Sequence, residues 1–362
     1  MSTLFLIGNG FDLNCGMKTR YVDVYNGYVN IESSTECLKK FKKTIASDID
    51  NWGDFEMAMA RYAWNFGSEQ EFLECSRDFT EYMETYLTEE ARLFKERLSN
   101  DQVMNAVIAE MGQSISGFYE DISHNVSGLM ERRNAGIVSN FEVISFNYTD
   151  AFDYIISKCA SSWRSPRINV IHIHGVLGDG PVLGVDNIEQ IKTKFRLTNK
   201  GKRGFVKPIF NVSYDEERVK TAQALINRSN TICLYGMSMG ESDLSWRNAL
   251  VEWLTNDENR HLFIYKYELA KNKYGTVQER MDTEEDEKIN LFLKWGMDVE
   301  SPIFERVHIP CGKNIFNVDG VIKRVNKELY DKKAREIEEE VERGRKFVEE
   351  SLQEIAVTEE SK

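Results

Sequence analysis

Short apolar runs of strand length alternate with polar and glycine-rich segments over much of the chain. The apolar runs lie at residues 4–7, 141–146, 169–174, 231–235 and 261–265. The helical patterns between them, with apolar residues at three- and four-residue spacing, lie at 151–159, 214–227 and 244–254. Strands that alternate with helices in this way predict an α/β protein with a doubly wound, mainly parallel sheet.

A long helical block interrupts this alternation. From residue 33 to residue 134 the apolar side chains keep helical spacing, and the segment contains no proline and no strand-like run. We therefore predict an α/β domain formed by residues 1–32 and 135–320, with a helical insertion at 33–134. Within the α/β domain, the basic and glycine-containing segment 192–211 is interpreted as a surface loop or lid.

The C-terminal segment 321–362 has a different character, because Glu, Lys and Arg dominate it and apolar residues are sparse. This pattern predicts a long charged helix. Two interpretations stay open: the helix is solvated, or it docks on another subunit and forms a homo-oligomer. The helical block is a second candidate surface for such an oligomer.

The first predicted strand runs directly into a Gly-x-Gly turn at Gly8 and Gly10. Glycines at the end of a strand let backbone N–H groups approach a phosphate closely. Leu13 stands where the Gly-x-Gly-x-x-Gly fingerprint has its third glycine. Taken alone, the segment is therefore also compatible with a plain tight turn.

Polar or glycine residues follow four of the predicted strands. These segments are residues 8–12, 145–150, 172–175 and 235–243. A single one is explained by helix capping or by a structural histidine. Because the carboxyl ends of parallel strands meet at one crevice, the four together predict a ligand site there.

Composition narrows the class of protein. The 362 residues carry a net charge of −13 and are 41% hydrophobic, which is typical of a soluble globular protein. The negative charge argues against non-specific binding of nucleic acid or acidic membranes. No apolar run approaches the roughly 18 residues of a membrane span, and a signal-peptide pattern is absent. We expect a cytoplasmic protein with neither membrane nor nucleic acid as a partner.

The six scattered cysteines form no Cys-x-x-Cys pair, which is typical of reduced thiols and disfavours a structural zinc site. His172 and His174 share a predicted strand at a spacing of two, so both are expected on one face. A metal site there lacks an obvious third ligand, and we expect no metal.

The motifs resemble those of the bacteriophage abortive-infection AbiH family. The matching segments are Gly-Asn-Gly-Phe-Asp-Leu at 8–13, Gly-x-x-Thr-x-Tyr at 16–21, Trp-x-x-Phe-Glu at 52–56, Phe-Asn-Tyr-Thr at 146–149, His-x-His-Gly at 172–175 and Tyr-Gly-x-Ser-x-Gly-x-Ser-Asp at 235–243. More remotely, their order is similar to that of the sirtuin-type (SIR2-like) NAD-binding fold of the Rossmann class. These resemblances imply a phage-defence protein that takes NAD or a related nucleotide as substrate or ligand.

The resemblance implies hydrolysis of the nicotinamide N-glycosidic bond, with His174 and Asn147 as catalytic residues. His174 would contact the ribose hydroxyls or take a proton from water, and Asn147 would position the water or the ribose. The implied cofactor-binding residues are Gly8, Asn9, Gly10, Phe11, Asp12, Thr19, Tyr21, Thr149, Gly175, Gly236, Ser238 and Asp243. For Asp12 and Asp243, helix capping is the alternative interpretation.

Two departures from the sirtuin pattern keep alternatives open. The two cysteine pairs of the deacetylase zinc module are absent, and Thr149 replaces an acid that ordinarily holds the nicotinamide amide. The replacement of this acid favours a non-catalytic nucleotide sensor. A nuclease is a third alternative, and the basic segment 192–207 is its sole support. In the Trp-x-x-Phe-Glu box we interpret Trp52 and Phe55 as core residues and Glu56 as a cap or a locally paired acid; a position of Glu56 over the cleft is the alternative.

Overall fold

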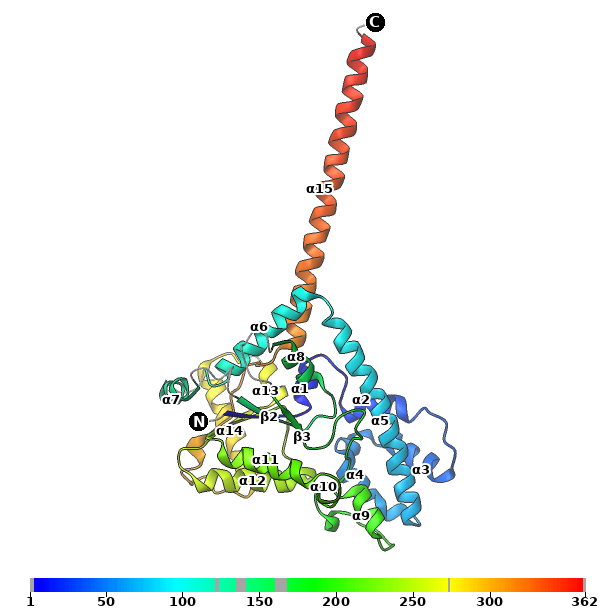
Figure 1. The fold of residues 1–362 in the computed structure, drawn as a ribbon, viewed down its shortest axis with the longest axis vertical. Coiled ribbons are helices and arrows are strands. Elements are labelled where there is room, and N and C mark those ends of the chain that lie inside the picture. Colours follow the sequence, from blue (N-terminus) through cyan, green and yellow to red (C-terminus); the bar gives the residue numbers. More distant parts are fainter. Residues whose placement is uncertain (1–2, 121–123, 135–140, 160–167, 273, 361–362) are drawn as a thin grey trace.

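A computed structural model describes the chain apart from residues 1–2, 121–123, 135–140, 160–167, 273 and 361–362 (Figure 1). Its centre is a parallel sheet of six strands in the order β3-β2-β1-β4-β5-β6. The strands are β1 Thr3–Ile7, β2 Phe141–Ser145, β3 Val170–His172, β4 Thr231–Tyr235, β5 His261–Tyr265 and β6 Val307–His308. This order is that of a Rossmann-like sheet, and it confirms the predicted doubly wound α/β fold.

Helices cover both faces of the sheet, because its strands are apolar on both sides. Phe5 and Ile7 of β1 contribute to one core, whereas Leu4 and Leu6 contribute to the opposite one. The helices that contribute to the first core include α6 Asp101–Gly117, α8 Ala151–Cys159 and α15 Val318–Glu360. The helices that contribute to the second core include α11 Glu216–Arg228, α12 Leu244–Asn256 and α14 Val277–Trp295.

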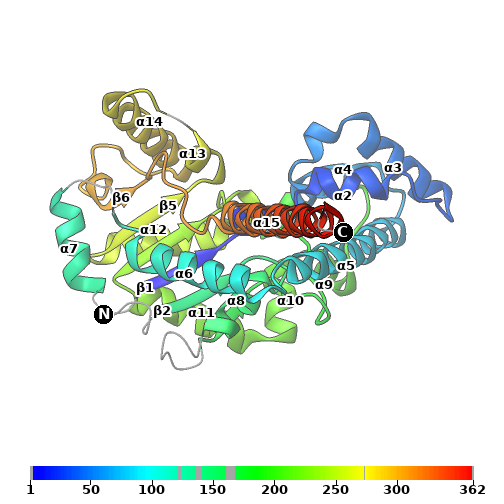
Figure 2. The ribbon, with the colours of Figure 1, turned by 90° about the horizontal axis from the view of Figure 1, so that it is seen from above.

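A third core lies beside the sheet and is rich in aromatic side chains. Its helices include α2 Tyr21–Tyr28, α3 Glu36–Ser47, α4 Phe55–Tyr62 and α5 Glu69–Arg97. At its centre, the rings of Phe55 and Phe79 stack with their centroids 3.9 Å apart. Figure 2 shows α2–α4 at one end of the view and α13 Tyr267–Lys271 and α14 at the other.

The helical block predicted at 33–134 divides between two cores. Its α3–α5 part builds the third core, whereas α6 and Met130 of α7 His124–Asn134 pack on the sheet. The start of the resumed α/β domain at residue 135 lies outside the described residues. None of the helices in the described ranges is long and apolar enough to cross a membrane.

The segment 192–211, predicted as a surface loop or lid, contains one helix and most of a second. These are α9 Asn199–Phe205 and α10 Lys207–Tyr214. Thr198 caps the N-terminus of α9, and the ring of buried Phe205 packs 5.2 Å from that of Phe72. The surface-loop prediction was wrong because the many lysines and glycines of this segment obscure three apolar residues, Leu197, Phe205 and Val206, which tertiary packing buries.

The loops that follow β1 and β4 touch backbone to backbone. The Gly8 N–H donates to the Tyr235 carbonyl, and the Gly10 N–H donates to the Gly236 carbonyl, both at 2.8 Å. Gly236 has a φ of +68°, and a Cβ atom on it would lie 2.5 Å from the Gly10 Cα. These glycines therefore serve the close approach of two loops, besides lining the space above the sheet.

We predict that Gly236→Ala lowers the free energy of unfolding by roughly 2–4 kcal/mol, because it combines a left-handed backbone with a steric clash. The matched control is Gly128→Ala in α7, where the nearest atom to the new Cβ lies 3.9 Å away. That change is expected to stabilise the protein by up to about 1 kcal/mol. Urea unfolding measures both, and equal stabilities of the Gly236→Ala variant and the wild type would contradict the role of this contact.

Candidate functional site

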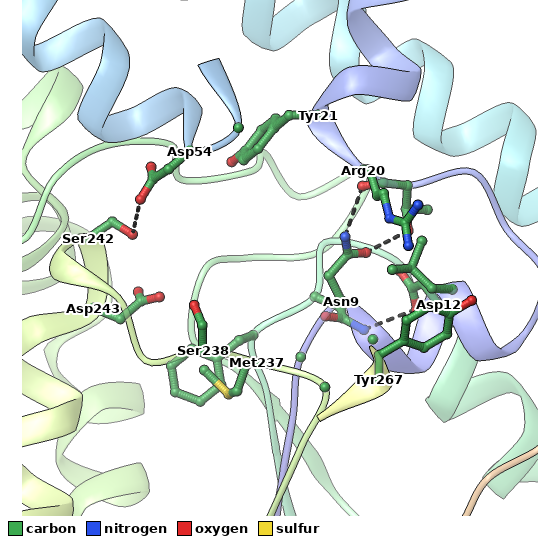
Figure 3. A pocket seen from close by; sticks show the side chains of 18 of the residues that line it. Asn9, Asp12, Arg20, Tyr21, Asp54, Met237, Ser238, Ser242, Asp243 and Tyr267 are labelled. Atoms are coloured by element: carbon green, nitrogen blue, oxygen red, sulfur yellow. Dashed lines mark hydrogen bonds between the residues drawn. The ribbon is translucent and has the colours of Figure 1, made fainter. Parts of the chain in front are cut away.

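A cavity of about 630 Å³ opens at the carboxyl ends of β1, β2, β4 and β5. The strand order reverses between β1 and β4, since β2 and β3 lie on one side of β1 whereas β4, β5 and β6 lie on the other. Ligands of open α/β sheets bind at such a point. The predicted site residues that line the cavity are Gly8, Asn9, Gly10, Asp12, Thr19, Tyr21, Asn147, Thr149, His174, Gly236, Ser238 and Asp243. Figure 3 shows Asp54, Ser242 and Asp243 on one side of it and Arg20, Asp12 and Tyr267 on the other.

Two predicted binding residues do not line this cavity. Phe11 is fully buried in the first core, where its ring contacts Phe152 with a centroid distance of 5.1 Å. Gly175 has a φ of +77°, and a Cβ atom there would lie 2.5 Å from the Gly180 carbonyl oxygen. We therefore correct both assignments: Phe11 anchors α1 Gly10–Asn14 to the core, and Gly175 permits the turn after β3.

A buried lysine organises one end of the cavity. Lys207 Nζ lies 3.1 Å from Asp243 Oδ1 and 3.2 Å from Glu56 Oε1, and it donates to the Ser242 carbonyl at 3.1 Å. The His174 Nε2–Asp243 Oδ1 distance is also 3.1 Å. Lys207, Glu56 and His174 are each at most 6% exposed, so the pairs are shielded from water.

The pKa values within this network follow from burial and charge. Burial raises the pKa of Glu56 to about 7, although Lys207 opposes the shift. Burial alone would also raise the pKa of Asp243, but Lys207 and His174 outweigh it and hold that pKa below its usual range. Burial and the nearby Lys207 lower the pKa of His174.

These shifts fix the proton positions on His174 at neutral pH. A neutral imidazole donates through one nitrogen, and the Asp243 carboxylate accepts from Nε2. Nδ1 is then the basic nitrogen, and it is buried without a hydrogen-bond partner. His174 is therefore a neutral base held in one orientation by a carboxylate.

A second polar cluster joins the ends of β1 and β2. Asp12 accepts hydrogen bonds from Asn147 Nδ2 at 3.0 Å and from Thr149 Oγ1 at 2.7 Å. Burial raises the pKa of Asp12 to about 7 despite these two donors. The Asn147 Oδ1 atom is buried and has no partner, which is rare for an amide oxygen inside a protein.

Neither acid serves as a side-chain helix cap. Asp243 occupies the N-cap position of α12, but its side chain makes no capping hydrogen bond. Asp12 lies within α1 and directs its carboxylate to Asn147 and Thr149. The alternative interpretation of these residues as caps is therefore wrong.

His172 and His174 have different partners. The strand ends at His172, and the chain turns before it reaches His174. His172 Nε2 lies 3.0 Å from Asp153 Oδ2 in α8, and its Nδ1 lies 3.1 Å from the Asn147 carbonyl oxygen. Burial alone would lower the pKa of His172, but Asp153 and that carbonyl raise it. His172 therefore braces the backbone of Asn147, and the predicted shared face is wrong.

Helix α4 reaches over the cavity from the third core. Its N-cap residue Asp54 accepts from the Met57 N–H at 3.0 Å and from the Ser242 hydroxyl at 3.4 Å (Figure 3). Glu56 in its first turn pairs with Lys207, so the prediction of a local partner is wrong and the alternative over the cleft is correct. Trp52 and Phe55 are core residues, as predicted.

Sequence reasoning missed Lys207. Residues 200–204, shortly before it in the chain, are all lysine, arginine or glycine, which led to its assignment to a basic surface segment. The available signal was Pro208, because proline is common in the first turn of a helix. It indicated that a helix begins at Lys207, as α10 does. Among the described residues, no three His, Cys, Asp or Glu side chains are grouped to hold a metal ion.

The fold and the cavity define a Rossmann-like α/β protein with a ligand cleft where the strand order reverses. The chain belongs to the bacteriophage abortive infection AbiH family, which matches residues 4–265. The matched range runs from β1 to the end of β5, so it contains the His174 and Asp12 clusters together. Membership supports a role in phage defence by abortive infection. No curated protein matches the sequence.

We predict that Lys207→Met destabilises the protein by about 3–5 kcal/mol at pH 8, because it leaves two buried carboxylates without a cation. Glu56 titrates near pH 7 in the folded wild type, above its unfolded value of 4.5. The free energy of unfolding therefore falls as pH rises from the unfolded pKa of Glu56 to its folded pKa. Without Lys207 the folded pKa of Glu56 is higher still, so the fall continues to higher pH.

Urea unfolding at pH 5.5 and pH 8 measures this effect. The difference between Lys207→Met and wild type should be smaller at pH 5.5, where Glu56 is protonated. Lys200→Met changes an exposed lysine on α9 and should match the wild type at both pH values. A pH-independent penalty for Lys207→Met would contradict the assigned ion pair.

Proposed function

We propose that this phage-defence protein binds NAD in the switch-point cavity and hydrolyses the bond between nicotinamide and ribose. The observation that carries the proposal is the state of His174. Its Nε2–H is bonded to an ionised Asp243, and its basic Nδ1 is buried without a partner beside the cavity. A neutral imidazole held by a carboxylate is a general base.

The cavity suits a ligand of this class in size and in polarity. Its volume of about 630 Å³ falls in the range of roughly 300–1,000 Å³ typical of small-molecule sites. Asn147 Oδ1 and His174 Nδ1 are buried polar atoms without partners, and a ribose hydroxyl or a water bound there would satisfy them. These residues would hold the ribose and the attacking water.

In the proposed reaction, water adds to the ribose carbon that bears nicotinamide. The bond from that carbon to the ring nitrogen breaks, and nicotinamide leaves with the electron pair as a neutral molecule. The proton of the water goes to His174 Nδ1, and Asp243 stabilises the resulting imidazolium through its bond to Nε2. Buried carboxylates also stabilise the positive charge that develops on the ribose.

Asp12 can take the place of the acid that the sirtuin pattern has at the position of Thr149. The Thr149 hydroxyl donates to Asp12 Oδ2, so the cavity regains a carboxylate beside the position where the sirtuin pattern has one. This acid titrates near pH 7, and in its protonated form it is both a donor and an acceptor. A carboxamide such as that of nicotinamide requires both kinds of partner.

A nucleotide sensor without turnover is the second candidate. The ion pairs of Lys207 connect α4 of the third core to Asp243 beside the sheet, at one end of the cavity. A ligand that enters between these elements changes their separation, which is a route for signalling. The nuclease alternative loses its support from Lys207, because this lysine is buried between carboxylates.

The test is incubation of purified protein with NAD and chromatographic measurement of free nicotinamide. We predict release by the wild type and at least a 100-fold slower release by His174→Ala, since general bases contribute about 10²–10⁴-fold. Asn147→Ala should also be slower. Asn259→Ala, at an exposed turn before the amino end of β5, is the matched control and should retain the wild-type rate.

Calorimetric titration with NAD separates the two candidates. Binding of NAD by the wild type without release of nicotinamide would favour the sensor. If the wild type does release nicotinamide, equal NAD binding by His174→Ala would support a catalytic role of His174. Release that persists at the wild-type rate in His174→Ala would refute the assigned base. Absence of both binding and release would refute the nucleotide site itself.

A further inference from the structure

The long helix α15 has two unequal parts. Val318, Val321, Ile322 and Val325 at its start are buried in the first core, and the contacts of this part are mainly with α6. Beyond Leu329 the helix leaves the body of the protein and projects into solvent (Figure 1). The side chains described from 330 to 348 are exposed, apart from Ala334, which is half-buried.

This projecting part carries an apolar stripe with a coiled-coil spacing. The stripe residues follow one another at intervals of 4, 3, 4, 3 and 4 and are Tyr330, Ala334, Ile337, Val341, Gly344 and Val348. Alternating steps of three and four are the a and d positions of a heptad repeat. Large apolar side chains on the stripe are open to water: Ile337 is 52% exposed and Val341 is 64% exposed.

A projecting helix of this kind needs a partner for its stability. Residues 330–348 extend over ~27 Å at 1.5 Å per residue. Isolated helices are marginal in water, and helices in proteins derive most of their stability from packing of an apolar face. Nothing in the described part of the same chain covers this stripe, which leaves it open to a second molecule.

The charges beside the stripe show which molecule fits. With Ala334 and Val341 at a positions, Lys333 and Glu340 occupy g positions, and Glu338 and Arg345 occupy e positions. In a parallel pair of helices, each g residue faces the e residue five positions later on the partner. Two copies of this helix then pair Lys333 with Glu338 and Glu340 with Arg345, and both pairs are attractive.

The antiparallel arrangement lacks this match. There, e positions face e positions and g positions face g positions, so pairing centred on this segment brings Glu338 against Glu338 and Glu340 against Glu340. Within the described chain the four flanking charges form no ion pair. The intrahelical pairs Lys332–Glu336 and Glu342–Lys346 lie on the outer face instead.

We propose that residues 330–348 of α15 pair with the same segment of a second copy of this chain as a parallel, two-stranded coiled coil. The apolar stripe forms the seam, and the g–e′ ion pairs set the direction and the register. The two bodies then lie at the same end of the coiled coil. This assembly is independent of the cavity and of its ligand.

Sedimentation velocity of the full chain over a range of concentrations tests the proposal. Wild type should sediment as a dimer, and Ile337→Glu/Val341→Glu should sediment as a monomer with unchanged thermal stability of the body. Arg335→Glu makes the same change in net charge on the outer face and should remain dimeric. A monomeric wild type, or a dimer that survives the double substitution, would overturn the proposal.

The parallel orientation of the two helices is tested by Ala334→Cys under mild oxidation. At an a position the two introduced thiols face each other in a parallel pair, so a cross-linked dimer is expected that wild type, oxidised alongside, does not form. A dimer that depends on Ile337 and Val341 but gives no cross-link would overturn the parallel register. Glu340→Arg should weaken dimerisation severalfold, and Glu340→Arg/Arg345→Glu should restore it.

Discussion

The buried cation of Lys207 is the interaction on which the cleft depends. A lysine this far from water is stable only with opposite charges at contact distance, and Asp243 and Glu56 provide them. Burial alone would lower the pKa of Lys207, yet these two carboxylates raise it, so the charge persists at any pH near neutrality. In turn, Lys207 keeps Asp243 ionised, and the ionised Asp243 orients His174. Lys207 thus keeps Asp243 ionised and, together with burial, lowers the pKa of His174.

The same interaction joins two cores with different origins. Glu56 begins a helix of the aromatic third core, whereas Asp243 follows β4 of the sheet. On the other side of the cavity, backbone contact between Gly10 and Gly236 holds the loops after β1 and β4 together. The cavity is therefore bounded by a fixed sheet edge and by a helix attached through charge. Three acids that line it, Asp12, Glu56 and Asp243, have pKa values shifted by burial or by neighbouring charges, as is common for groups at functional sites.

Much of the fold was predictable because its signals are local. The strand at 231–235 and the helix at 151–159 have the predicted bounds, since buried parallel strands and amphipathic helices leave clear patterns. The strand ends that carry Asp12, Asn147 and Asp243 could be grouped in advance, because a parallel sheet brings its carboxyl ends together.

The contacts that define the site's chemistry could not be predicted, because they arise between distant segments. Lys207 stands in a basic segment, but its neighbours Phe205 and Val206 are buried in the third core, and its side chain pairs with Glu56 inside the protein. Glu56 and Lys207 are 151 positions apart in sequence, a separation at which no periodicity relates two charges. The different partners of His172 and His174 depend on where β3 ends, and strand ends are the least certain feature of a sequence pattern.

The central claim is that the switch-point cavity is a nucleotide site, and a crystal structure of His174→Ala soaked with NAD tests it most directly. Our account predicts the dinucleotide across the ends of β1 and β4, with its nicotinamide ribose beside Asn147. NAD bound elsewhere on the molecule, with solvent alone in the cavity at saturating nucleotide, would contradict it.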